Sequence, residues 1–397
     1  MGLHLLKQTD PEFEAAEQAH SDRLRDVIRG EIRAAGSIPF WRFMELALYA
    51  PGLGYYSAGK TKFGEAGDFV TAPELGTLFA RTCARAVAPV LKASDDNVFL
   101  EVGAGTGAFA AAALTELEQI DALPARYQIL DRSAELRERQ RETLAARVPH
   151  LLDRVEWLDV PPEDSWRGVL FANEVLDALP VHRFVIRDGE PHELHVALDE
   201  AGNFGFVERE ADLMLLGAIR GIEEDLDHRL PEGYVSEVAP QLPYWFDAVC
   251  GTLSAGLAVF IDYGYSRREY YRPDRNRGTL LSFYRHRAHE QFLDRPGLQD
   301  LTASVDFTAL ALAATRVRFP LAGFTSQANF LMAAGLLDLF QLEQLQVGEI
   351  DRYRLAQEIK RLTLPGEMGE RFKVISFARG IDHVPDPFQA YDLSRTL

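Results

Sequence analysis

The stretch NVFLEVGAGTG, residues 97–107, carries the strongest structural signal in this chain. Its apolar residues predict a buried strand that ends in Glu101, and three glycines follow at alternate positions, Gly103, Gly105 and Gly107. Glycine permits a positive φ and lets a ligand approach the main chain where a Cβ would block it. An alanine-rich helix is expected directly after the turn, and its first N–H groups would face the turn. Together these features predict a nucleotide-cofactor site in a doubly wound α/β fold.

Two nucleotide cofactors fit this turn by pattern alone. Counting Ala108 as the third small residue gives the G-x-G-x-x-G/A pattern of dinucleotide sites. The pattern E-x-G-x-G-x-G is typical of S-adenosylmethionine (SAM) methyltransferases. Glu101 favours SAM, because SAM carries a sulfonium and an ammonium, whereas the two phosphates of a dinucleotide would be repelled by a nearby carboxylate. A structural glycine turn that holds no ligand is the third interpretation.

A second apolar strand is predicted at residues 127–130 and ends at Asp131, 24 residues beyond Gly107. An acidic residue at about this spacing holds the ribose hydroxyls of a bound nucleotide. Ser133 is placed to cap a helix expected at residues 134–147. Asp131 could instead serve only as a helix-entry residue, but its position at the end of a strand favours ribose binding.

Composition limits the kinds of partner that the chain can have. A net charge of −18 over 397 residues argues against nucleic-acid binding, because such binding needs a large basic surface. The two isolated cysteines predict neither a disulfide framework nor a cysteine metal site. His192 and His195 lie in a predicted strand, where their spacing places them on opposite faces, so no metal site is expected.

The same sequence carries no membrane or export signal. No apolar run approaches the roughly 18 residues that a bilayer-spanning helix needs, so membrane insertion is not expected. The first 20 residues lack the apolar core of a signal peptide, and their acidic residues argue against a transit peptide. These observations predict a cytoplasmic protein.

The order of predicted elements divides the chain into an N-terminal region and a core. The N-terminal region, residues 1–92, is helical at 11–50, and its glycine- and aromatic-rich loop contains Asp68, a candidate cofactor contact. The core, residues 93–397, has two insertions, a β-meander at about 182–236 and an excursion on the substrate side at 265–310. Seven strands are predicted for a mostly parallel sheet, at residues 98–101, 127–130, 155–158, 169–172, 257–261, 317–319 and 372–377.

Polar or acidic residues follow four of these strands. They are Glu101, Asp131, Asn173 with Glu174, and Asp262 with Tyr263. Ligands of open α/β sheets bind beyond the carboxyl ends of the strands. We therefore expect these side chains to lie around one site.

Ten short motifs, in order along the chain, resemble the MidA-like family of SAM-dependent methyltransferases. They are Gly54-Tyr55-Tyr56, Gly67-Asp68-Phe69, Pro73-Glu74, residues 101–107, residues 173–180 (NEVLDALP), Asp262-Tyr263-Gly264, residues 277–280 (RGTL), Asp300-Leu301-Thr302, Val305-Asp306-Phe307 and residues 368–373 (MGERFK). The resemblance covers nearly all of residues 38–377. It implies the Rossmann-like class I methyltransferase fold and SAM as methyl donor.

The resemblance also implies an activity. The mitochondrial members of this family assist the assembly of respiratory complex I and are described as protein arginine methyltransferases. A protein substrate is therefore expected, and the resemblance implies a complex I subunit as that protein. The candidate cofactor-binding residues are Glu101, Gly103, Gly105, Gly107, Asp131, Asn173 and Asp68.

An arginine acceptor needs help from carboxylates, because its guanidinium stays protonated and is a poor nucleophile. Glu174, at the end of the fourth strand, is the candidate that orients the acceptor and draws its positive charge away from the reacting nitrogen. Asp177 is a second catalytic candidate, with capping of the following turn as its alternative role. Asp262, Tyr263 and His286 are candidates for substrate contact, and a solvated loop residue is the alternative for His286.

Two other functions remain open at this point. A catalytically quiet assembly chaperone would bind SAM for structural reasons only. An oxidoreductase dependent on NAD(P) would use the same glycine turn for a dinucleotide.

Overall fold

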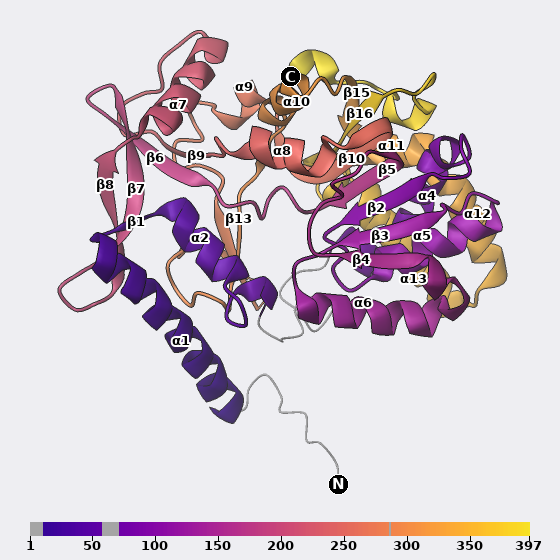
Figure 1. Ribbon diagram of the computed structural model, residues 1–397, viewed down its shortest axis with the longest axis horizontal. Helices are drawn as coiled ribbons and strands as arrows, with labels where there is room; N and C mark the ends of the chain where they lie inside the picture. Colours follow the sequence, from indigo (N-terminus) through magenta and orange to yellow (C-terminus); the bar gives the residue numbers. More distant parts are fainter. Residues whose placement is uncertain (1–10, 58–70, 286) are drawn as a thin grey trace.

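The computed structural model describes residues 11–57, 71–285 and 287–397, with side chains from residue 14 onward (Figure 1). Seven strands follow one another across the central sheet, in the spatial order β15 (Leu321–Ser326), β16 (Phe372–Arg379), β10 (Leu253–Tyr265), β5 (Trp166–Asn173), β2 (Val98–Val102), β3 (Arg126–Leu130) and β4 (Val155–Leu158), and an eighth, β14 (Val305–Asp306), pairs with β10 off this path. Neighbours from β10 to β4 are parallel, and β16 runs antiparallel to both β10 and β15. The predicted Rossmann-like, mostly parallel seven-strand sheet is confirmed.

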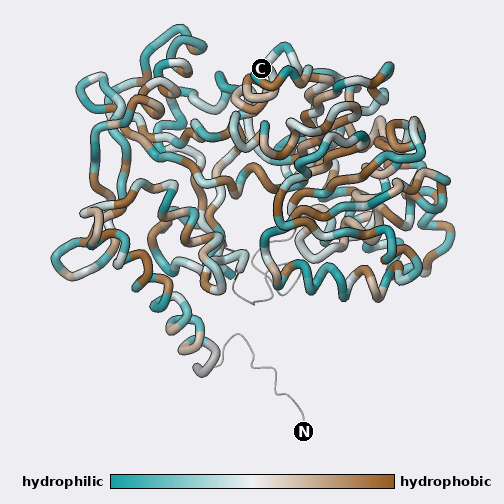
Figure 2. Tube along the Cα trace, viewed as in Figure 1, coloured by the Kyte–Doolittle hydropathy of each residue, from teal (hydrophilic) through white to brown (hydrophobic). Residues whose placement is uncertain are grey.

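Helices cover both faces of this sheet, as the sequence of alternating strands and helices requires. One face packs against α4 (Leu78–Leu91), α5 (Ala108–Gln119), α6 (Ala134–Arg147), α11 (Gln327–Ala333), α12 (Leu336–Gln346) and α13 (Glu349–Thr363). The other face packs against α8 (Leu242–Cys250) and α10 (Phe307–Arg316). The strands are therefore buried between apolar faces. In Figure 2 the central strands are mostly brown (hydrophobic), whereas the outward side of α6 is teal (hydrophilic).

Strands β5 and β2 approach each other closely at Gly168. Gly168 in β5 has a φ of 134°, and a Cβ added there would lie 2.0 Å from the carbonyl oxygen of Val98. Any larger residue would therefore push β5 away from β2. This pair matters for the site, because both strands deliver site residues at their carboxyl ends.

The predicted strand at residues 317–319 is wrong. Val317 follows the end of α10, Arg318 has a left-handed φ of 57°, and the strand begins only at Leu321. Phe319 is fully buried against the core, which explains its apolar neighbours without a strand. Pro320 lacks the N–H that a strand ladder uses, so the pairing starts after it.

A second, antiparallel sheet holds the predicted β-meander. Its order is β1 (Ile38–Pro39), β7 (Glu190–Leu198), β6 (His182–Arg187) and β9 (Val235–Val238), with β8 (Phe204–Glu210) paired to β7. The helices α1 (Pro11–Ala35) and α2 (Phe40–Tyr49) pack on one side, and α7 (Leu213–Leu226) packs on β6. The helices α1 and α2 thus join the inserted sheet through β1, and they lie with it on the left of Figure 1, whereas α4 of the predicted N-terminal region packs on the central sheet on the right.

The excursion after β10 contains more regular structure than its sequence pattern suggested. It includes α9 (Arg267–Tyr270) and a small sheet in the order β12 (Arg287–His289), β11 (Leu281–Tyr284) and β13 (Asp300–Thr302), and β14 (Val305–Asp306) then pairs with the end of β10. Short helices α3 (Ala72–Leu75) and α14 (Met368–Arg371) complete the α-helices of the described chain.

The division of the chain into an N-terminal region and a core at residue 92, and the bounds of the two insertions, stay predictions.

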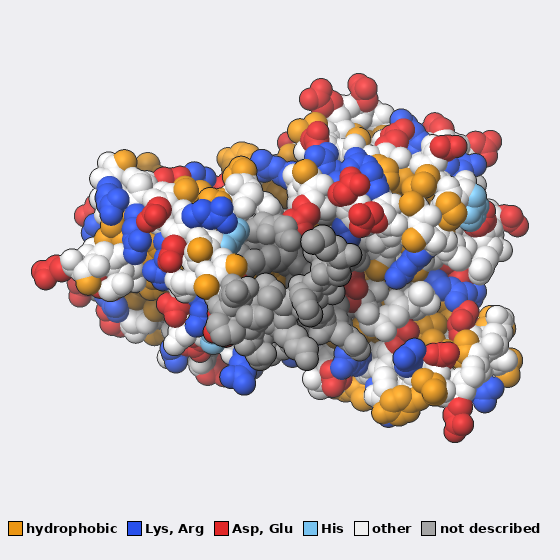
Figure 3. Space-filling view, turned by 90° about the horizontal axis from the view of Figure 1, so that it is seen from below, with side chains coloured by type: hydrophobic (Ala, Val, Ile, Leu, Met, Phe, Trp, Pro, Cys, Tyr) orange, Lys and Arg blue, Asp and Glu red, His pale blue; other side chains and the backbone are white. Residues whose placement is uncertain are grey.

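The surface carries both signs of charge. Lys and Arg side chains are interspersed with Asp and Glu over the described part of the face shown in Figure 3. This pattern differs from the basic stripe of a nucleic-acid-binding surface. A search of the described helices finds none with the length and apolar character that crossing a bilayer demands.

Candidate functional site

The glycine turn has the backbone that its sequence predicts. Gly103, Gly105 and Gly107 have φ values of 68°, 53° and 82°, all in the left-handed region. A Cβ at Gly107 would lie 3.1 Å from the Cα of Gln140, so this glycine allows a close helix contact. A Cβ at Gly105 would meet no atom within 4 Å and would project into open space. The turn is therefore open at Gly105, the position where a ligand could approach the main chain.

Gln140, on α6, ties three parts of this cradle together and was not anticipated from the sequence. Its Nε2 donates to the carbonyl of Gly105 at 3.1 Å and to Oδ2 of Asp131 at 2.8 Å. Its Oε1 accepts from the indole of Trp157, on β4, at 3.1 Å. Gln140 is fully buried, so these three bonds satisfy polar groups that water does not reach.

We expect Gln140→Leu to weaken binding of S-adenosylhomocysteine (SAH) by about tenfold. The substitution keeps the apolar stem but frees the carbonyl of Gly105 and leaves the Trp157 indole without its acceptor, at a cost of about 1–3 kcal/mol in unfolding free energy. Calorimetric titration with SAH and thermal unfolding measure the two effects. Trp157→Phe removes only the third bond, and an equal loss of SAH affinity in that variant would contradict the role of Gln140 in the turn.

Asp131 stands at the end of β3, where a ribose-binding carboxylate was predicted. Its Oδ1 accepts from the backbone N–H of Ser133 at 2.9 Å, and burial raises the pKa of its carboxyl group. Each oxygen has a second lone pair beyond these bonds. Ser133 caps α6 as predicted, accepting from the N–H of Leu136 at 3.3 Å. The ribose contact of Asp131 stays a prediction that this geometry permits.

Glu101 lies deeper than the sequence argument assumed. It is 4% exposed, and its Oε2 accepts from the hydroxyl of Tyr127 at 2.7 Å. Burial raises the pKa of Glu101 to about 8, so the carboxyl group is mostly protonated at neutral pH. The charge repulsion that was expected to exclude a pyrophosphate is therefore weakened, and the choice of cofactor needs other evidence.

The loop after β5 carries the main catalytic candidate. Glu174 has a left-handed φ of 53°, which is unusual for a residue other than glycine. Its backbone N–H donates to the carbonyl of Ile261, on β10, at 2.9 Å. Its Oε1 accepts from the side-chain amide of Asn173 at 3.1 Å and from the N–H of Ala72 at 3.4 Å. Such strained backbone is retained at sites where a side chain must be aimed.

Asp177 and Tyr263 form a pair beside Glu174. The Tyr263 hydroxyl donates to Oδ2 of Asp177 at 2.9 Å. Oδ1 of Asp177 is buried and has no hydrogen-bond partner among the described residues. Burial raises the pKa of Asp177 to about 6, and burial followed by the charge of Asp177 raises the pKa of Glu174 to about 8. Interaction with the backbone N–H groups of Asp177 and Ala178 partly offsets the rise of the Asp177 pKa, and the predicted capping and catalytic roles of Asp177 both stay predictions.

Asp262 is 1% exposed and binds backbone N–H groups. Its Oδ2 accepts from Leu176 at 2.9 Å and from Asp177 at 3.2 Å, and its Oδ1 accepts from Tyr263. These bonds hold the loop that presents Glu174 and Asp177. The observed contacts describe a positioning role, and the predicted substrate contact of Asp262 stays a prediction.

Two tyrosines and one aspartate line another wall of the site. The motifs of Tyr56 and Asp300 were noted in the sequence without an assigned role, and Tyr49 was not singled out. Tyr49 and Tyr56 stack with ring centroids 5.6 Å apart. The hydroxyl of Tyr56 lies 3.0 Å and 3.1 Å from the two carboxylate oxygens of Asp300, on β13. Burial, followed by the charge of Asp300, raises the pKa of both tyrosines. Asp177 also raises them, which places this wall beside the loop after β5.

The structure thus gathers most of the predicted site residues at the carboxyl ends of four strands. Asp68 and His286 lie outside the described residues, and their predicted contacts stay predictions. The donors that reach Glu174, Asp177 and Asp262 within the described chain are amide and hydroxyl groups, with no cationic side chain. This arrangement can attract a cationic group that carries several N–H donors.

Known proteins with similar sequences share a methyltransferase description. A relative from Caenorhabditis elegans, "Protein arginine methyltransferase NDUFAF7 homolog, mitochondrial", is 27% identical over 89% of this chain and 85% of its own length. The Homo sapiens protein of that name is also 27% identical, over 90% of this chain and 84% of its own length. The prediction of a cytoplasmic location is contradicted by these relatives, because their names place them in mitochondria.

A solved structure is similar over the whole chain. This crystal structure of a protein from Burkholderia thailandensis, bound to SAH, is 44% identical and covers 99% of this chain and 100% of its own. Its TM-score with this chain is 0.90. SAM is therefore the cofactor, and the open Gly105 turn, the free helix start and the Asp131 carboxylate fit it. The alternative of a dinucleotide oxidoreductase is set aside.

The family comparison agrees with this cofactor. A family model described as "Putative S-adenosyl-L-methionine-dependent methyltransferase" matches residues 79–325, which include the glycine turn, the loop after β5 and β10. The chain belongs to this family of SAM-dependent methyltransferases.

Proposed function

We propose that this methyltransferase acts on an arginine side chain of a protein, with Glu174 and Asp177 holding the guanidinium. The names of the curated relatives support an arginine on a protein as the acceptor. The family resemblance drawn from the sequence motifs supports a complex I subunit as that protein. The chemistry of the site supports the guanidinium independently of both.

The observation that carries the proposal is the unpartnered oxygen of Asp177. Its Oδ1 is buried without a hydrogen-bond partner among the described residues, next to a second carboxylate on Glu174. Leaving such an oxygen buried and unpaired costs about 1–3 kcal/mol or more for a charged group. A guanidinium offers five N–H donors in a fixed fork and can satisfy this oxygen and Glu174 together.

The chain's own residues then prepare the acceptor. A bound SAM supplies a methyl group on a positively charged sulfur. Glu174 and Asp177 attract the positive charge of the guanidinium toward the nitrogens that they contact, which leaves the remaining nitrogen richer in electrons. Tyr49 and Tyr56 stack on each other beside this loop, and Asp262 holds the loop through its backbone N–H groups, so both features help to fix the position of the acceptor.

The proposal is tested by methylating the proteins of an extract from cells that lack this protein. The purified enzyme is added with isotopically labelled SAM, and the proteins are hydrolysed for mass spectrometry. We expect label in methylated arginine. Label confined to another amino acid, or no label in protein at all, would refute the arginine proposal. The second result is also the one that a catalytically quiet assembly chaperone would produce.

We expect kcat/KM for the protein acceptor to rise between pH 6 and pH 8. Glu174 and Asp177 bind a guanidinium as carboxylates, and their raised pKa values of about 8 and about 6 leave them partly protonated at lower pH. The arginine stays charged throughout, so the rise reports these two groups. Initial rates at saturating SAM across this range measure the effect.

The free energy of unfolding is expected to fall with rising pH, in contrast to kcat/KM. An acid whose pKa is higher in the folded than in the unfolded protein takes up a proton on folding, so its contribution to stability falls as pH rises from about 4.5 to 8. The pKa of Glu101 is shifted in the same direction.

A value of kcat/KM for the protein acceptor that does not change between pH 6 and pH 8 in the wild type would contradict the role of Glu174 and Asp177 in binding.

A further inference from the structure

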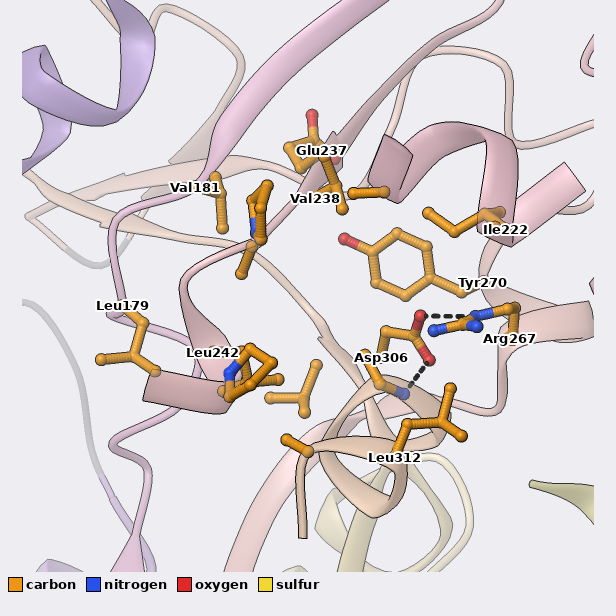
Figure 4. Close-up of a pocket in the computed structure, with 18 of the residues that line it drawn as sticks. Leu179, Val181, Ile222, Glu237, Val238, Leu242, Arg267, Tyr270, Asp306 and Leu312 are labelled. Atoms are coloured by element: carbon orange, nitrogen blue, oxygen red, sulfur yellow. Dashed lines mark hydrogen bonds and ion pairs between the residues drawn. The ribbon is translucent and has the colours of Figure 1, made fainter. Parts of the chain in front are cut away.

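A cavity of about 520 Å³ lies between the inserted sheet and the core, behind the loop that presents Asp177. Figure 4 shows Ile222, Val238, Leu242 and Leu312 around an open space, with Tyr270 on one side. These side chains come from α7, β9, α8, α10 and α9, so four helices and one strand contribute walls. The volume lies within the range of pockets that hold a ligand.

Helix α7 is built with small residues toward this cavity. Gly217 and Gly221 lie inside the helix and line the cavity, and a Cβ added at either would meet no atom within 4 Å. Glycine inside a helix costs about 0.5–1 kcal/mol relative to alanine. The packing of the described chain gives no reason for this cost, because the space beside both glycines is left open. An occupant from outside the chain would give one.

The cavity opens to solvent through an exposed apolar rim, and this open cavity is called the groove below. Met214 from α7, Tyr244 from α8 and Leu312 from α10 line it and are 46%, 71% and 48% exposed. Three large, exposed apolar side chains from three separate helices thus line the same cavity. Contiguous exposed apolar surface around a groove is typical of a protein-interaction site.

One exposed carboxylate at the groove can meet a basic partner. Four carboxylates line the groove, from Glu224, Asp225, Glu237 and Asp306, against the guanidinium groups of Arg267 and Arg316. Arg267 is held in ion pairs with Asp225 and Asp306, and Glu237 is fully buried and paired with Arg183. Among the described residues this leaves Glu224 and Arg316 as the lining charges without an ion pair. Glu224 is exposed at the rim, and the chain as a whole carries a charge of −18. An apolar segment with Lys or Arg beside it would match both the walls and the rim.

The groove and the acidic site share one wall. Leu176 and Leu179 line the groove, while Asp177, between them in sequence, belongs to the acidic site. The carbonyl of Asp177 accepts from the N–H of Ala303, which also lines the groove, at 2.9 Å. A segment bound in the groove therefore contacts the loop that holds Asp177.

We propose that this groove binds an apolar segment, flanked by basic residues, of the same protein that carries the acceptor arginine. The inference rests on the proposed function for the identity of the partner as a methyl acceptor. The groove supplies affinity for that protein, and the acidic site receives its arginine. Short arginine peptides without the segment are then poor substrates because of weak binding.

Filling the groove tests this role. Gly221→Leu places a side chain in the open space without a clash, and Gly217→Leu does so one turn earlier as a second variant. The matched control is Gly30→Leu, because Gly30 is also a glycine inside a helix with no atom within 4 Å of an added Cβ, but lies in α1. Thermal unfolding and SAH titration verify that all three variants fold and bind the cofactor.

Methyl transfer from labelled SAM to the proteins of a cell extract that lacks this protein is then measured against extract concentration. We expect Gly221→Leu to raise the concentration for half-maximal labelling at least tenfold, with the maximal rate and SAH affinity within about twofold of wild type. Gly30→Leu should match the wild type. An unchanged half-maximal concentration in both groove variants would overturn the proposal, as would a fall in maximal rate alone.

A charge reversal tests the basic flank. Glu224→Lys at the rim should raise the half-maximal concentration several-fold, and the difference from wild type should shrink at high salt. Glu142→Lys, an equally exposed reversal on α6, should have no effect. Equal effects of the two reversals would overturn the assignment of a basic partner.

The same experiment separates this inference from the proposed function. The total amount of label bound to protein reports binding in the groove, whereas the amino acid that carries the label identifies the acceptor. Groove-dependent labelling of another amino acid would refute arginine and retain the groove. Sedimentation gives the last outcome, since a wild-type dimer that Gly221→Leu dissociates would show that a second copy of this chain occupies the groove and overturn the proposal.

Discussion

Glu174→Gln is expected to reduce methyl transfer by about 10³-fold while changing the affinity for SAH by less than about twofold. Glutamine keeps the shape of the side chain and the backbone position, but it replaces the carboxylate that draws charge from the guanidinium. Removing one such electrostatic contact in a water-excluded site costs about 10²–10³ in rate. Single-turnover labelling of extract proteins and calorimetry with SAH measure the two quantities separately.

The control for this prediction is Glu142→Gln, an isosteric change at an exposed position of α6. It should leave both quantities unchanged. The left-handed backbone at Glu174 is compatible with the test, because the substitution adds no β-branching at a φ of 53°. Retention of more than about a tenth of wild-type turnover by Glu174→Gln would show that Glu174 does not act on the acceptor.

Gly105→Val should weaken SAH binding by at least about 100-fold. Gly105 has a φ of 53°, and its missing Cβ leaves open space above the turn. A valine there fills the space that the cofactor needs and also strains the backbone by about 1–2 kcal/mol. Calorimetry with SAH gives the affinity, and chemical unfolding gives the strain.

Gly202→Val provides the matched control, because Gly202 also has a positive φ, of 80°, and open space around an added Cβ. It lies between β7 and β8, away from the glycine turn. This variant should show the same order of strain with unchanged SAH affinity. Normal SAH binding by Gly105→Val would mean that the cofactor does not approach the main chain at this turn.

Local sequence patterns predicted the backbone of the glycine turn and the helix cap at Ser133. The alternating glycines, the strand before them and the Ser133 cap depend on residues within a few positions of one another. Their backbone preferences act before any tertiary contact forms, so the pattern could be read directly. The strand at residues 317–319 shows the limit of this reading, because burial of Phe319 against the core produced the same apolar spacing without a strand.

The proposed acceptor half of the site depends on contacts between distant parts of the chain. The hydroxyl of Tyr56 reaches Asp300 across 244 residues of sequence, and Tyr263 reaches Asp177 across 86. No local preference specifies such pairs, because the two partners meet only when the small sheet and β10 are in place. Gln140 belongs to the same class, since a glutamine on an amphipathic helix carries no signal of its three buried bonds.

The pKa values of the carboxyl groups in the site could not be predicted from the sequence at all. Glu101, Asp177 and Glu174 are ordinary acids by sequence. Burial in the folded protein is the main cause that raises their pKa values to about 8, about 6 and about 8, and neighbouring carboxylates add to the rise at Glu101 and Glu174. The order of residues along the chain was sufficient for the fold class, the cofactor turn and the strand ends, because these follow from short-range backbone preference and apolar periodicity. Which carboxylates stay charged, and which oxygen is left for a substrate, depends on desolvation by neighbours, and that exists only in the folded protein.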